Sequence, residues 1–209
     1  MSPPPDPKPR GRGRPARSQA HIEDVRARIA ACALKLFREE GYAAVSMRRL
    51  AQEAGCTVVT LYKYYDRKID VLRDLWAQVF NELFDELDRQ LVADRDAVLR
   101  LNVIAIGYVE YWLKRRDHYF MVFMSSGLTQ SDVSVFVQND ALLQRFAIFR
   151  DTLAKALDEK VSEAELTLKS DLLLCVLNGI AHNLITISAY PWTRPEKLVR
   201  AAVQGILRT

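Results

Sequence analysis

The sequence predicts an all-α fold in which a small N-terminal helical domain precedes a larger helical domain. Apolar residues recur at three- and four-residue spacing through most of the chain, and no segment alternates apolar and polar residues as a strand does. The 209 residues are 49% hydrophobic and 27% charged, which is typical of a globular chain. We expect a disordered basic arm at residues 1–19, the small domain at 20–66 and the larger domain at 67–209.

Three helices are expected in the small domain. The first covers residues 22–40 and ends at Gly41. Ser46 suits the N-cap of a short second helix, because its hydroxyl can accept a bond from a free amide of the first turn. Gly55 follows that helix, where a left-handed residue is favoured, and Thr57 can cap a third helix. The expected inward residues are Ile29, Ala33, Leu36, Phe37, Leu50, Ala51, Ala54, Leu61 and Tyr65.

The larger domain is expected to be a set of longer helices. Asp66 can cap a long helix that starts at Arg67 and reaches the low nineties. Ser162 and Glu165 match a capping box at the start of another helix. An apolar patch at 133–137 is expected to form a short helix. The remaining helices are expected over residues 96–115, 117–124, about 140–160, 162–190 and 196–207.

The second and third helices, joined by a turn containing Gly55, have the spacing of a helix-turn-helix. The third would expose its N-terminus, a threonine hydroxyl, a lysine and phenolic groups, which suit phosphate oxygens and base edges. Its expected outward residues are Val58, Val59, Thr60, Tyr62 and Lys63, and Tyr64 is a further expected DNA contact. Taken alone, this pattern fits both a DNA-reading unit and an ordinary αα-hairpin with aromatic packing.

The flanking charges favour the DNA-reading interpretation. Residues 8–17 hold five basic residues and no acidic one, and their Pro and Gly prevent a packed helix. A narrow cationic strand suits an A·T-rich minor groove, and Arg12 and Arg14 belong to an Arg-Gly-Arg-Pro run that resembles an AT-hook core. A solubilising tail is the alternative.

The basic charge is confined to the N-terminal third of the chain. Residues 1–75 carry 15 Lys/Arg against 9 Asp/Glu, whereas residues 76–209 carry 15 against 17. The net charge of +4 therefore comes entirely from the first third. Such an asymmetry is typical of a nucleic-acid module attached to a neutral one.

Cysteine usage and hydropathy bear on the compartment. Cys32, Cys56 and Cys175 are isolated and odd in number, which favours a reducing cytoplasm over a disulfide framework. The N-terminus shows no apolar secretory signal. Residues 172–193 lack Asp, Glu, Lys and Arg over a length that spans a bilayer, but polar residues interrupt them and Pro191 closes them. We expect a helix buried in a core or subunit interface there, and a cytoplasmic protein with no membrane partner.

With these motifs placed, the chain resembles the TetR family of bacterial transcriptional regulators over about residues 20–72. The resemblance implies a three-helix DNA-binding domain on a larger helical ligand-binding domain. It also implies a homodimer whose last two long helices, here 140–160 and 162–190, form a four-helix bundle with the partner. Two DNA-binding domains would then bind a pseudo-palindromic operator in double-stranded DNA. The residues that carry the resemblance are Gly41-Tyr42, 46–55, 57–65, Lys68 and Val71-Leu72.

By matching position, the resemblance implies roles for individual residues. Thr57, Tyr62 and Lys68 resemble phosphate contacts, and Arg48 is a candidate contact to phosphate or base. The groove-facing positions are Val58, Val59, Thr60 and Lys63. Family members often carry a polar residue at position 58 or 59. Valine cannot hydrogen-bond a base edge but can contact a thymine methyl, so we expect specificity to depend on apolar contacts, Lys63, the arm and DNA shape.

No catalytic or metal-binding motif is present: the three histidines lie far apart, and there is no G-x-S-x-G, P-loop or HExxH. We therefore expect no enzyme activity, metal or cofactor. Asn178 and His182 share a helix face and suit the polar anchors of a ligand pocket. Its expected apolar lining is Tyr108, Trp112, Phe120, Phe123 and Met124. The alternative places Asn178 and His182 in a dimer interface and the aromatic residues in the core.

The resemblance thus implies a dimeric, sequence-specific repressor that a small, largely apolar ligand releases from its operator. Release requires that the ligand bind the splayed arrangement of the two DNA-binding domains more tightly than the DNA-bound one. Two alternatives are a DNA-binding dimer without ligand control and a helical interaction module.

Overall fold

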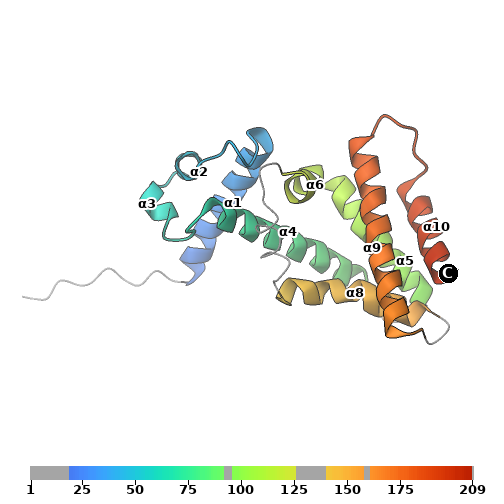
Figure 1. Cartoon of the computed structure of the whole chain (residues 1–209). Helices are drawn as coiled ribbons and strands as arrows, with labels where there is room; N and C mark the ends of the chain where they lie inside the picture. The colour runs from blue at the N-terminus through green and yellow to red at the C-terminus, as the bar shows by residue number, and fades with distance from the viewer. Residues whose placement is uncertain (1–18, 92–95, 126–139, 158–160, 209) are drawn as a thin grey trace, which may run out of the picture.

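The computed structural model describes residues 19–91, 96–125, 140–157 and 161–208. Every regular element in these ranges is an α-helix, as predicted. Helices α1 to α3 form a small group at one end, which we call the head, and α4 runs from it into the larger group, the body (Figure 1). The bounds are α1 Gln19–Glu39, α2 Met47–Glu53, α3 Val58–Leu61, α4 Lys68–Gln90, α5 Ala97–Lys114, α6 Arg116–Phe123, α8 Asp140–Ala156, α9 Glu163–Thr186 and α10 Pro195–Arg208.

Two predictions lie outside the described residues. They are the basic arm with Arg12 and Arg14, and the short helix at 133–137. Within the described ranges, no helix is both long enough and apolar enough to cross a membrane.

The head folds around the inward faces that the sequence predicts. Leu36, Leu50 and Leu61, one from each head helix, are fully buried. The Ser46 hydroxyl caps α2 by accepting from the Arg49 amide at 3.1 Å, as expected. Gly55 has a φ of 64°, the left-handed conformation that a side chain would strain. The cap and the turn residue predicted from the sequence of the head therefore agree with the way its helices pack.

The start of α4 differs from the prediction, because Asp66 does not cap it. Arg67 is the N-cap, and its amide donates to the Asp70 carboxylate at 2.9 Å. A carboxylate three residues into a helix can reach back to the N-cap amide and also lies at the positive end of the helix dipole. Asp70 therefore takes the role that we had assigned to Asp66.

Helix α4 packs against α5 in the body. Its buried side includes Trp76, Phe80 and Phe84, and Phe80 and Trp112 of α5 meet edge to face with centroids 5.8 Å apart. At Gly107 of α5 a Cβ would lie 2.9 Å from Leu87 Cδ2 of α4, closer than real Cβ atoms approach. The glycine therefore lets the two helices cross in close contact.

The body contains the other predicted helices with ends that differ by at most four residues. Ser162 caps α9 by accepting from the Glu165 amide at 3.2 Å, as the capping-box pattern predicts. The expected helix over 162–190 ends at Thr186, because the Trp192 indole donates to the Ile187 carbonyl at 2.9 Å and the chain turns toward Pro191. The helix expected to reach residue 160 ends at Ala156.

Candidate nucleic-acid interface

Helix α3 begins with a well-defined cap that faces outward. The Thr57 hydroxyl accepts from the Thr60 amide at 3.0 Å and lies 2.9 Å from the Thr60 hydroxyl. The α-helix is shorter than the expected 57–65, because the chain tightens into turns after Leu61. These turns bring Tyr65 back into the core, where it is 3% exposed.

The structure separates the outward residues of α3 into two groups. Val59 and Tyr62 are 69% and 49% exposed, and Lys63 and Thr57 are also exposed. The half-buried residues are Val58, Thr60 and Tyr64. Val58 packs against the head core, so the expectation that it faces outward is only partly met. Its neighbour Val59 is the apolar tip of this surface.

Lys68 is not a free cation in this structure. Its ammonium donates to the backbone carbonyls of Tyr42 at 2.6 Å and Ala43 at 3.3 Å, and it lies 4.2 Å from the centre of the Tyr42 ring. Burial lowers the pKa of the Lys68 ammonium. Lys68 therefore braces the turn between α1 and α2. Arg48, by contrast, is exposed at the start of α2.

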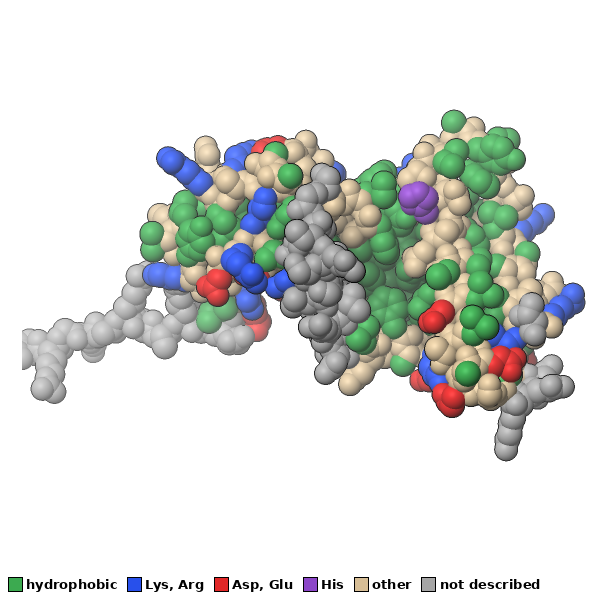
Figure 2. All heavy atoms as spheres, in the orientation of Figure 1, with side chains coloured by type: hydrophobic (Ala, Val, Ile, Leu, Met, Phe, Trp, Pro, Cys, Tyr) green, Lys and Arg blue, Asp and Glu red, His purple; other side chains and the backbone are tan. Residues whose placement is uncertain are grey.

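The helix-turn-helix exposes side chains of several kinds. Arg48, Thr57, Val59, Tyr62 and Lys63 supply a guanidinium, a hydroxyl, a methyl group, a phenol and an ammonium. Figure 2 shows Lys and Arg side chains spread over the head. Cations and hydroxyls suit backbone phosphates, and the exposed valine suits a thymine methyl.

The family model described as "Bacterial regulatory proteins, tetR family" matches residues 29–75, which run from α1 through the helix-turn-helix into α4. The chain carries a TetR-family helix-turn-helix domain. This assignment confirms the resemblance read from Gly41-Tyr42 and residues 46–65. It also confirms the prediction that the chain is not an enzyme, since the matched relatives are transcriptional regulators.

Among curated TetR-family relatives, the HTH-type transcriptional regulator HbdR of Aromatoleum sp. is 26% identical over 118 residues, which are 56% of this chain and 52% of that protein. The HTH-type transcriptional repressor KstR of Mycobacterium tuberculosis is 34% identical over 77 residues, 37% of this chain and 35% of that protein. The chain therefore spans about half or less of these relatives. A solved TetR-family regulator, PfmR of Thermus thermophilus, is 25% identical with a TM-score of 0.59, over 88% of this chain and 95% of that one.

A charged network that the sequence analysis missed holds α2 of the TetR head against α1. Arg49 pairs with Glu40 and Glu53, each at 2.9 Å, and Lys35 of α1 pairs with Glu53 at 2.7 Å. The i, i+4 spacing of Arg49 and Glu53 is visible in the sequence, but Lys35 is 18 residues away from Glu53. The network links α2 to α1 on the surface of the head.

This network predicts a pH dependence of stability. Hydrogen bonds from Lys35 and Arg49 lower the pKa of the Glu53 carboxyl below its ordinary value of 4.5. A lowered folded-state pKa contributes stability above the unfolded pKa that is lost as the pH falls through the folded one. We expect the free energy of unfolding to fall below about pH 4.5, and to fall less steeply in Glu53→Gln. Urea unfolding at a series of pH values checks this, and parallel curves for the two proteins would contradict it.

The head is fastened to α4 by a second polar contact. The Tyr65 hydroxyl donates to the Asp74 carboxylate of α4, and the Arg26 guanidinium of α1 lies 5.4 Å from the centre of the Tyr65 ring. Burial, together with this hydrogen bond, raises the pKa of Tyr65. The tyrosine therefore stays protonated and acts as a donor between the end of the helix-turn-helix and the body.

The seven expected ligand residues divide between the two sides of α6. On the inner side, the Tyr108 hydroxyl donates to Asn178 Oδ1 at 2.7 Å, and burial raises the pKa of Tyr108. His182 Nδ1 lies 3.0 Å from the Tyr119 hydroxyl, a partner that the sequence analysis missed. The inner residues are Tyr108, Trp112, Phe123, Asn178 and His182. Phe120 and Met124 lie on the outer side and line a different pocket, against the head.

One polar atom of the inner group has no hydrogen bond of ordinary geometry. Trp112 is fully buried, and its indole N–H forms no such bond to any acceptor in the described part of the chain. Its ring packs against Phe123 with centroids 5.2 Å apart. No cluster of His, Cys, Asp and Glu in the described ranges could hold a metal ion.

Proposed function

We propose that this chain is a sequence-specific DNA-binding transcriptional regulator, acting as a dimeric repressor released by a small apolar ligand. The observation that carries the proposal is the capped helix-turn-helix with Val59, Tyr62 and Lys63 exposed on one surface. A single α3 of 4 residues contacts few base pairs. Two heads of a dimer, separated by one helical repeat of DNA, would bind the two halves of a pseudo-palindromic site more tightly than one head binds a single half.

The dimer interface is proposed on α9, whose outer face is apolar but has no partner within the described part of the chain. Leu168 and Leu172 are 68% and 43% exposed, and Cys175 and Gly179 continue the same face at helical spacing. A Cβ at Gly179 would meet nothing within 4 Å, so there is room for a second helix. Figure 2 shows hydrophobic side chains along the outer face of α9.

The second helix of the interface is proposed to be α10 instead of α8. Helix α10 packs against α9, where the Lys169 ammonium donates to the Ile206 carbonyl at 3.0 Å, and it exposes the small residues Ala201 and Gly205. Helix α8 exposes Leu143 together with Gln144, Asp151 and Lys155. Ala201 and Gly205 permit close approach of a second helix, and both α8 and α10 expose charges, since α10 also exposes Lys197, Arg200 and Arg208. This proposal replaces the pair 140–160 and 162–190 expected from the family resemblance.

Effector binding is proposed among the inner aromatic residues of the body. The Trp112 indole N–H offers a hydrogen-bond donor, and Asn178 and His182 offer polar atoms on α9. A ligand there contacts α5 and α9 and so reaches the helices proposed to form the dimer. It would release the operator to the extent that it favours the splayed spacing of the heads.

Binding of selected DNA sequences tests this function. In a fluorescence-anisotropy titration, Lys63→Ala is expected to relax the sequence preference at one G-containing position by about 1–3 kcal/mol, since a groove-facing lysine can donate to guanine O6 and N7. Val59→Ala is expected to change preference only at T-containing positions, because it removes a methyl contact. Binding without sequence preference would instead favour an architectural DNA-binding dimer, and no binding at all would favour an interaction module. Release by uncharged apolar compounds would support the repressor mechanism.

A further inference from the structure

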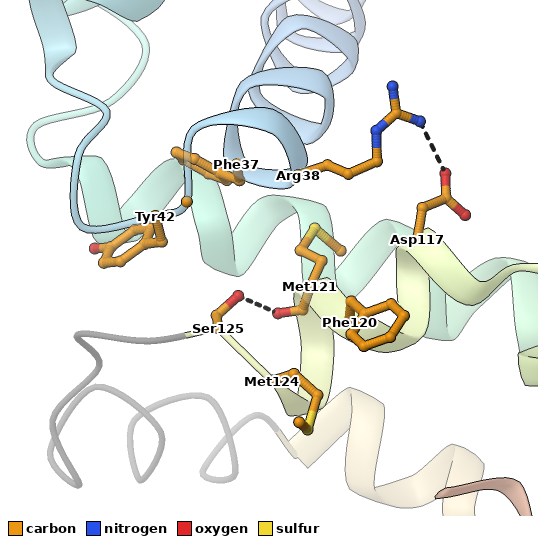
Figure 3. Close-up of a pocket in the computed structure, with 9 residues that line it drawn as sticks. Phe37, Arg38, Tyr42, Asp117, Phe120, Met121, Met124 and Ser125 are labelled. Carbon is orange, nitrogen blue, oxygen red and sulfur yellow. Dashed lines mark hydrogen bonds and ion pairs between the residues drawn. The ribbon is translucent and has the colours of Figure 1, made fainter. Parts of the chain in front are cut away.

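A pocket lies at the joint between head and body. Its volume is about 430 Å³, within the range of small-molecule sites. The head supplies one wall from the end of α1 and the turn that follows it, and the body supplies the other from α6 (Figure 3). The lining residues are Phe37, Arg38, Gly41, Tyr42, Asp117, Phe120, Met121, Met124 and Ser125.

The walls of this joint pocket are apolar and partly uncovered. Phe120 and Met124 are 44% and 47% exposed and lie one turn apart, so they form one exposed apolar strip. Phe37 and Tyr42 meet edge to face at 5.2 Å on the opposite wall. Aromatic rings and a flexible methionine together suit a flat hydrophobic molecule, since thioethers and ring edges both contact aromatic faces favourably.

The polar groups of the pocket favour neither a cationic nor an anionic ligand. Arg38 and Asp117 stand at the rim with Nη1 and Oδ2 3.9 Å apart, and their charges cancel (Figure 3). Glu39 adds a carboxylate 3.3 Å from the Arg38 guanidinium, so an anion at the rim would meet two acidic groups. The Ser125 hydroxyl is engaged with the Met121 carbonyl at 2.6 Å. An uncharged ligand is therefore favoured.

Both walls are anchored to α4, so the pocket is formed before a ligand arrives. The Trp76 indole of α4 donates to the Met121 carbonyl of α6 at 3.4 Å. Lys68 at the start of α4 holds the Tyr42 carbonyl at 2.6 Å. Preformed walls reduce the ordering cost of binding.

We propose that the joint pocket binds an uncharged, mainly aromatic small molecule, at a site separate from the inner residues around Trp112. The ligand would lie between Phe37 and Tyr42 of the head and Phe120 and Met124 of the body. Because its walls come from both parts, an occupied pocket stabilises the arrangement of head and body seen here. Any consequence for operator binding rests on the proposed function, whereas binding itself does not.

The test uses the full-length protein without DNA and the uncharged probe N-phenyl-1-naphthylamine, whose fluorescence rises in apolar sites. Phe120→Ser is expected to weaken probe binding about tenfold, as the loss of one aromatic contact surface implies. Leu143→Ser is the matched control, because Leu143 is a similarly exposed large apolar residue (45%) that lies on α8 and lines neither the joint pocket nor the inner group. It should leave the dissociation constant unchanged within about twofold. Thermal unfolding of both variants confirms that they are folded.

Three results would overturn the proposal. They are an absence of saturable binding, equal weakening by the two substitutions, or tighter binding of the anionic analogue 8-anilino-1-naphthalenesulfonate than of the neutral probe. Equal weakening would show that the loss of probe binding is not specific to the joint pocket. Because no DNA is present, failure of operator binding would leave this test unaffected, and failure of this test would leave the DNA-binding proposal unaffected.

Discussion

Replacing Leu172 by Glu is expected to convert the protein into monomers and to weaken operator binding at least about 100-fold. Leu172 is 43% exposed at the middle of the α9 face that we propose as the dimer interface. In a symmetric interface the substitution would bury two unpaired carboxylates, which is strongly unfavourable. A monomer also loses the second head, whose effective local concentration supplies factors of about 10² to 10⁴ in affinity. Light scattering after size-exclusion chromatography and anisotropy with a full operator measure the two effects.

The matched control for this prediction is Leu143→Glu on α8. Leu143 is 45% exposed, almost the same as Leu172, so both substitutions place a carboxylate on an exposed leucine position. We expect Leu143→Glu to leave the dimer intact, because α8 is proposed to lie outside the interface. If Leu143→Glu dissociates the dimer and Leu172→Glu does not, the interface involves α8 and our assignment of α9 with α10 is wrong.

Leu61→Ala is expected to lower the free energy of unfolding by about 3 kcal/mol, in the range for leucine truncations that leave a cavity. Leu61 is fully buried between the short helices of the head, which have little other core to support them. We expect the head to lose its fold at a lower urea concentration than wild type, with a parallel loss of DNA binding. Urea unfolding followed by circular dichroism measures the change.

Val59→Ala is the control for the truncation of Leu61. Both substitutions remove apolar carbons from α3, but Val59 is 69% exposed and makes little contact with the core. Its expected change in unfolding free energy is below about 0.5 kcal/mol. A loss of stability as large as that of Leu61→Ala would show that Val59 packs inside the head, and would remove it from the proposed DNA surface.

The head was more predictable than the body. Ser46, Gly55 and Thr57 are caps and a turn residue whose roles depend on neighbours within a few positions, and all three took their predicted roles. We predicted Asp66 as the N-cap of α4, but the helix begins one residue later, so Arg67 is the N-cap and Asp70 accepts from its amide.

The surroundings of several site residues could not be predicted, because they depend on contacts with residues far away in the sequence. The family resemblance implied a phosphate contact at Lys68, yet its ammonium is held by the carbonyl of Tyr42, 26 residues earlier. Phe120 and Phe123 are neighbours on one short helix, but one faces the head and the other faces Trp112. A helical pattern of so few residues does not show which side meets which partner.

The sequence alone determined that this chain is all-helical, that it carries a TetR-type helix-turn-helix, and that its basic charge lies at the N-terminal end. These properties follow from periodicity, capping and composition, which act over short stretches of chain. The tertiary structure decided that Val59 protrudes while Val58 packs inward, that Lys68 braces a turn, and that the apolar residues of α6 divide between two sites. Each of these outcomes depends on the free energy of burial against residues far along the chain, which no local pattern records.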